Sequence, residues 1–176
     1  MMDKSNDRLD WLRLAGDQWL ANARAGFVEV YGEADDDFCG LLDKVMDYWE
    51  YVQMPERITV NVALCGSGAA QSWHVARRLA FGNVTTYANY SAGSAGLWLF
   101  MAGDRRICKP RTEFLYHGNL YRWMKTGPSD EQRAQWMAER TTQDFDFWFG
   151  WAQHNGPFEF DAGHALELGV ATELAE

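Results

Sequence analysis

Hydrophobic and polar positions along the chain switch repeatedly between two periods. Short apolar runs, mostly rich in β-branched and aromatic residues, predict strands at 27–31, 58–64, 84–90, 107–108 and 113–116. Between and after them, apolar residues at helical spacing predict one helix that begins at 35–37 and further helices over 69–81, 97–102, 129–150 and 162–168. Strands that alternate with helices predict an α/β fold with a mostly parallel sheet.

The two ends of this pattern define the domain organisation. Leu9, Leu12, Trp19 and Leu20 lie near helical spacing and predict a helix before the first strand. No repeat or low-complexity linker interrupts the rest of the chain. We therefore expect an N-terminal helical extension over residues 1–25 and one domain over residues 26–176.

Composition and charge narrow the class of protein. The 176 residues are 47% apolar and 15% aromatic, which predicts a packed interior. A net charge of −9 argues against a nucleic-acid-binding surface. No apolar run is long enough to span a membrane, and the polar first ten residues lack the pattern of a signal peptide. Three cysteines at unrelated spacings fit reduced thiols, so we expect a cytoplasmic protein.

Ser94 is the strongest candidate for chemistry. A serine hydroxyl needs a base within hydrogen-bond reach and donors aimed at the developing oxyanion. Ser94 stands between a predicted strand and an apolar helix, flanked by Gly93 and Ala95. The N–H of Ala95 is a natural oxyanion donor, and so is one amide of the loop Gly66-Ser67-Gly68. Small residues at a strand-to-helix turn can also serve packing alone, so Ser94 needs a partner.

His117 supplies that partner, because it ends another predicted strand. The carboxyl ends of parallel strands converge on a shared crevice, so we expect Ser94 and His117 to meet there.

These segments resemble the ClpP-type serine peptidases. Ser94-Ala95-Gly96, followed by an apolar helix and Ala102-Gly103, is similar to the family's active-serine segment. Pro110 with His117 seven residues later is similar to the strand that leads to its histidine. Weaker likeness extends over residues 27–174.

The resemblance implies a ClpP/crotonase-like domain of repeated ββα units, with the helix from Ser129 to Gly150 projecting as an assembly handle. It implies hydrolysis of peptide bonds in a polypeptide substrate, without a cofactor or metal. It also implies a homo-oligomer of heptameric rings, stacked in pairs to fourteen subunits, and an AAA+ unfoldase as partner.

The chain departs from the family where the third member of the triad is expected. That family's Asp position falls on Pro157, which cannot orient a histidine. Asp161 is the first substitute and Asn155 the alternative, although Asp161 also suits the N-cap of the helix that follows. We therefore expect slow hydrolysis from a Ser–His pair.

Other functions fit the sequence less well. Gly66-Ser67-Gly68 lacks the third glycine of a dinucleotide-binding turn, and Ala92 breaks the G-x-S-x-G motif of α/β-hydrolases. Cys65 with His74 is a weak nucleophile pair, since a buried structural cysteine is the simpler interpretation. Two alternatives stay open: a structural or regulatory subunit with weakened catalysis, favoured by Pro157, and a phage capsid-maturation protease of the same family.

Overall fold

The computed structural model describes residues 16–32, 36–52, 54–66, 69–80, 83–118, 127–154 and 156–176. The helices are α2 (Gly16–Arg24), α3 (Asp36–Tyr51), α4 (Ala69–Leu79), α5 (Ala95–Met101), α6 (Asp130–Arg140), α7 (Phe145–Gln153) and α8 (Ala162–Glu167). The strands are β1 (Phe27–Gly32), β2 (Ile58–Gly66), β3 (Val84–Ser94), β4 (Arg105–Cys108), β5 (Glu113–Tyr116), β6 (Phe158–Asp161) and β7 (Glu173–Leu174). No described helix is both long and apolar enough to cross a membrane.

The described strands form one mostly parallel sheet with the order β1-β2-β3-β4-β7. Along one edge, the long strand β3 pairs with two different strands. Residues 85–88 pair with β4, and residues 91–93 pair with β5, both in parallel. On its other side β5 pairs with β6, and this is the antiparallel pair of the described sheet. The predicted α/β class with a mostly parallel sheet is confirmed.

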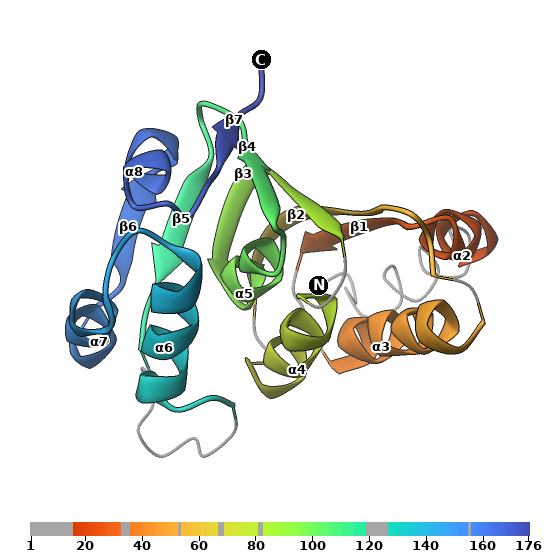
Figure 1. Ribbon diagram of the computed structural model, residues 1–176, viewed down its shortest axis with the longest axis horizontal. Helices are drawn as coiled ribbons and strands as arrows, with labels where there is room; N and C mark the ends of the chain where they lie inside the picture. The colour runs from red at the N-terminus through yellow and green to blue at the C-terminus, as the bar shows by residue number, and fades with distance from the viewer. Residues whose placement is uncertain are drawn as a thin grey trace, which may run out of the picture.

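The core lies between this sheet and the helices α3, α4 and α5, which cover the same face of β1, β2 and β3 (Figure 1). Along β1 and β2, Val28, Val30, Val60 and Val62 are buried, whereas the alternating Glu29 and Asn61 are partly exposed. This period of two is what a strand with one covered face requires. All seven residues of α5 are buried, which explains why its sequence is apolar around its whole circumference.

Two helices replace the single long helix that we expected from Ser129 to Gly150. The capping box at its start is present, because the Ser129 hydroxyl accepts from the Gln132 amide and the Gln132 side chain accepts from the Ser129 amide. The helix ends at Thr141, which is extended, and Asp144 then caps α7 by accepting from the Phe147 amide. The expectation of a projecting handle is therefore wrong for the described residues.

The helices α6 and α7 pack against each other as a hairpin beside β5 and β6 (Figure 1). Trp148 of α7 is fully buried, and its ring contacts Tyr116 edge to face at 5.0 Å. Its Nε1 donates to the Thr141 hydroxyl at 2.8 Å, which ties α7 to the break that precedes it. Burial of this large aromatic side chain favours the hairpin over an exposed straight helix.

The C-terminal segment is fastened to the domain by one buried arginine. The guanidinium of Arg106 donates to four backbone carbonyls, at distances of 2.7–2.9 Å, those of Gly103, Arg140, Gly169 and Val170. Burial lowers the pKa of Arg106 to about 10, so the side chain remains charged at neutral pH. Arg106 thereby joins β4 to the end of α6 and to the turn that follows α8.

Candidate active site

Ser94 adopts a backbone conformation that side-chain-bearing residues rarely take. It ends β3 and precedes α5 with φ 51° and ψ −116°, and it is the one described non-glycine residue with positive φ. Its hydroxyl makes no capping hydrogen bond to the helix that it starts. A strained residue on a sharp strand-to-helix turn is typical of an exposed nucleophile.

The sheet register places the backbone of Ser94 between two predicted partners. On one side its Cα pairs with that of Gly66 in β2. On the other side Gly93 pairs with Leu115 in β5, so the next step in register sets Ser94 beside Tyr116, with His117 one residue further. Neighbouring strands lie about 4.8 Å apart, so the three segments end at the same edge of the sheet.

His117 is half-buried, and its ring has a defined partner. Nδ1 lies 2.6 Å from the carbonyl oxygen of Gly118. Burial lowers the pKa of His117 below its ordinary value. The Gly118 carbonyl raises it, the Arg133 guanidinium lowers it and the Asp130 carboxylate raises it, in decreasing order of effect, and the lowering prevails. At neutral pH the imidazole is therefore uncharged, as a general base requires.

Two charged residues near His117 were missed in the sequence. Asp130 and Arg133 lie in the first turn of α6, where Arg133 Nη1 donates to Asp130 Oδ1 at 3.0 Å. Gln153 of α7 donates to the other carboxylate oxygen at 2.9 Å. The capping box predicted the start of α6, but nothing in the sequence predicted that this turn lies beside the end of β5. The α6–α7 hairpin thus places an ion pair, Asp130 with Arg133, near the imidazole.

The two candidates for a third triad member have different outcomes. Asp161 pairs with Glu113 at the far end of β5, whereas Phe158 pairs with Tyr116 next to His117. Four residues at about 3.4 Å each separate Asp161 from His117 by roughly 14 Å along the strand. Its carboxylate accepts from the His164 amide at 2.9 Å, which confirms the N-cap. Asn155 lies outside the described residues.

Pro157 lies beside the end of β5. Tyr116 pairs with Phe158 in the antiparallel β5–β6 pair, so Pro157 is the next residue opposite His117. A proline there has no side-chain acceptor for the ring. The position of the expected acid is therefore adjacent to the base, although the acid itself is missing.

The oxyanion candidates are described in part. Ala95 is the first residue of α5 and is fully buried, and the backbone of Gly66 runs beside Ser94. Ser67 and Gly68 lie outside the described residues. Among the candidate backbone amides, that of Ala95 is next to Ser94 in the chain, and that of Gly66 is next to it in the sheet.

Other groups offer little chemistry. Burial raises the pKa of the Cys108 thiol to about 11, which leaves it protonated and unreactive. His74 lies on α4 at 3.7 Å from Asp43, on the outer surface. Within the described part of the chain, no three His, Cys, Asp or Glu residues are grouped as metal ligands. The larger hollow, about 1040 Å³ between α4 and α6, is lined by neither Ser94 nor His117.

Comparison with known proteins supports the fold and not a family. No family model matches the chain, and no curated protein matches it. A solved structure described as a peptidase from Plasmodium falciparum is 11% identical, covering 91% of this chain and 99% of its own, with a TM-score of 0.74. Another, described only as an enzyme, is 12% identical, covering 89% of this chain and 97% of its own, also with a TM-score of 0.74. The chain therefore shares a mixed α/β fold with a peptidase.

Proposed function

We propose that the chain is a serine hydrolase of the ClpP type that cleaves peptide bonds through Ser94 and His117. The observation that carries the proposal is the strained backbone of Ser94 at a strand-to-helix junction, in register with Gly66 and next to the end of β5. This junction brings the backbone of Ser94 to the edge of the sheet at which β2 and β5 also end.

In the proposed reaction the Ser94 hydroxyl attacks the peptide carbonyl while His117 takes its proton. The oxyanion is held by the Ala95 amide and by one amide of the loop that begins at Gly66. His117 then returns the proton to the leaving amine, and water releases the acyl group by the reverse sequence. Within the described ranges no carboxylate is hydrogen-bonded to the His117 ring. The loss of that group costs about 10⁴-fold in turnover in a serine-protease triad. Hydrolysis is therefore slow.

Active-site labelling with a fluorophosphonate tests this proposal. The wild-type protein should form a covalent adduct that peptide mass spectrometry locates on Ser94, at a rate well below that of complete triads. Ser94→Ala should remove the adduct, and His117→Ala should slow its formation. Ser91→Ala is the matched control, because Ser91 lies on the same strand. An adduct that persists in Ser94→Ala would refute the assignment.

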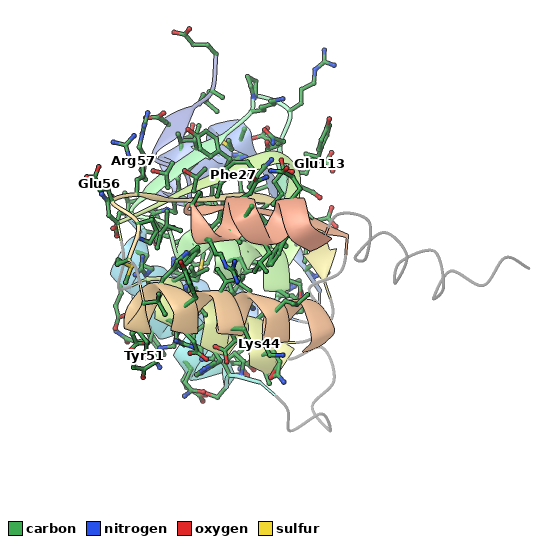
Figure 2. The ribbon with its side chains drawn as sticks, turned by 90° about the vertical axis from the view of Figure 1, so that its right-hand side faces the viewer. Phe27, Lys44, Tyr51, Glu56, Arg57 and Glu113 are labelled. Atoms are coloured by element: carbon green, nitrogen blue, oxygen red, sulfur yellow. The ribbon has the colours of Figure 1, made fainter. Side chains whose placement is uncertain are left out.

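A ring-shaped homo-oligomer that works with an AAA+ unfoldase is the assembly that the resemblance implies, and we include it in the proposal. Exposed apolar side chains support a subunit contact, since Tyr51, Val52 and Met54 at the end of α3 are 78%, 68% and 59% exposed. Figure 2 shows Tyr51 at this end of α3, on the side away from α2. An apolar pocket of about 450 Å³ that includes Trp49 and Ile58 adjoins them.

Light scattering at micromolar concentration tests the assembly, and a monomer would contradict it. Tyr51→Ser should lower the measured mass if the end of α3 is a contact.

A structural subunit with weakened catalysis is the second candidate, and Pro157 favours it. In that case the labelling rate would equal that of the Ser94→Ala protein, while the oligomer would still form.

A further inference from the structure

The contact between His117 and Gly118 defines which ring nitrogen carries the proton. A carbonyl oxygen can only accept a hydrogen bond, and it lies 2.6 Å from Nδ1. Nδ1 must therefore carry hydrogen in the neutral ring. The lone pair then resides on Nε2, which is the nitrogen that a base in a serine hydrolase uses.

The Gly118 carbonyl is held in place by α7. A Cβ on Gly118 would overlap the Ala152 carbonyl group, so the two backbones approach closer than any other residue type would allow. Tyr116, two residues before Gly118, is tied to the same helix, because its hydroxyl donates to the Trp148 carbonyl at 3.2 Å. Gly118 is buried, so water does not replace the contact.

We propose that Gly118 is the positioning residue of this site, and that its carbonyl takes the orienting part of the missing carboxylate. The inference rests on the proposed function of Ser94 and His117. The carbonyl fixes the tautomer and the ring orientation, but it carries only a dipole. Among the residues that the structure describes, the charged groups that act on the ring are Asp130 and Arg133 of α6, which form an ion pair with each other. The neutral Gln153 of α7 donates to Asp130.

Nitrogen NMR of histidine-labelled wild-type protein tests the tautomer without any need for activity. The His117 signals, assigned by their loss in His117→Gln, should show protonated Nδ1 and unprotonated Nε2 at pH 7.5. Unprotonated Nδ1 would overturn the proposal, whatever the labelling of Ser94 shows. A correct tautomer without a Ser94 adduct would instead count against the proposed function alone.

A pair of glycine variants then tests the positioning. Gly118→Ala must displace the carbonyl, so a mixed tautomer and about 100-fold slower labelling are expected, as for a displacement of about 1 Å in an active site. Gly150→Ala is the matched control on α7, because a Cβ there has no atom within 4 Å. Gly118→Ala with wild-type tautomer, pH profile and labelling rate would overturn the proposal. If this variant fails to fold, the wild-type tautomer alone decides.

Discussion

At the residue scale, the backbone of Ser94 links stability to chemistry. Its φ of 51° and ψ of −116° lie in a region of backbone conformation that few residues with a β-carbon adopt. Such conformations cost about 1–3 kcal/mol each and persist where the surrounding structure imposes them. In Ser94 the imposed turn is bounded by the β2–β3 pairing before it and the buried helix α5 after it.

Replacing Ser94 by glycine should therefore stabilise the protein. Ser94→Gly relieves the strain in the folded state, but glycine also raises the conformational entropy of the unfolded chain, which offsets part of the gain. The free energy of unfolding should therefore rise by about 1 kcal/mol. Ser94→Ala keeps the β-carbon and should stay within about 0.5 kcal/mol of wild type. Urea denaturation measures both. Equal stability of the two variants would show that the backbone is not strained.

The burial of His117 predicts the pH dependence of labelling. The neutral imidazole is the active form, and its pKa is lowered, so the labelling rate should rise with pH and level off below the ordinary histidine value of about 6.5. In the unfolded chain His117 titrates at that ordinary value. Between the folded and the unfolded pKa, the unfolded chain therefore binds more protons than the folded protein. The free energy of unfolding should therefore fall as the pH drops below about 6.5.

His117→Gln should remove this pH-dependent contribution to the free energy of unfolding. A midpoint of labelling above pH 7 would contradict the assignment of His117 as a buried, neutral base.

The sequence suggested candidate residues for the site, but it did not predict the contacts that surround them. Ser94 and His117 follow apolar strands, and that pattern is local. The contact of Gly118 with Ala152 joins positions 34 residues apart, and no period or motif signals it. The left-handed backbone of Ser94 also escaped prediction, because it requires the packing of α5 rather than a glycine in the sequence.

At the scale of elements, most strands and helices with apolar periodicity were predicted to within a few residues; β3 runs four residues beyond its predicted end at 90. The strand at 113–116 has the expected bounds, and β2 begins at the predicted Ile58. The short strands β6 and β7 were missed, because β7 has only two residues and β6 alternates two apolar with two acidic residues. The break between α6 and α7 was missed although Asp144 is a favourable N-cap, since the apolar spacing on both sides reads as one helix.

The pairing of β5 with β6 predicts that Pro157→Asp should strengthen the site. The register sets residue 157 opposite His117, where a carboxylate would favour the imidazolium. Labelling of Ser94 should become at least tenfold faster, and the pKa of His117 measured by NMR should rise. Pro157→Asn removes the same ring without adding charge and should leave both nearly unchanged. Equal rates in the two variants would show that residue 157 does not reach the histidine.

At the scale of the whole molecule, Arg106 decides whether the C-terminal elements stay attached. Arg106→Met leaves its four carbonyl acceptors without a donor, so the free energy of unfolding should fall by about 3 kcal/mol or more. The adjacent Arg105 pairs with Glu173 at the exposed surface, and Arg105→Met should change stability little. Thermal denaturation of the pair measures the difference, and similar losses would contradict the role of Arg106.

The folded-back arrangement of α6 and α7 also constrains how copies of this chain could associate. If two rings were joined by straightening this hairpin into one arm, α7 would swing away from β5 and uncover Trp148. The same movement would withdraw Ala152 from Gly118 and leave the imidazole free to rotate. On the proposed function, stacking through an extended arm would abolish hydrolysis, so a hydrolytic assembly would have to use surfaces that leave the hairpin closed.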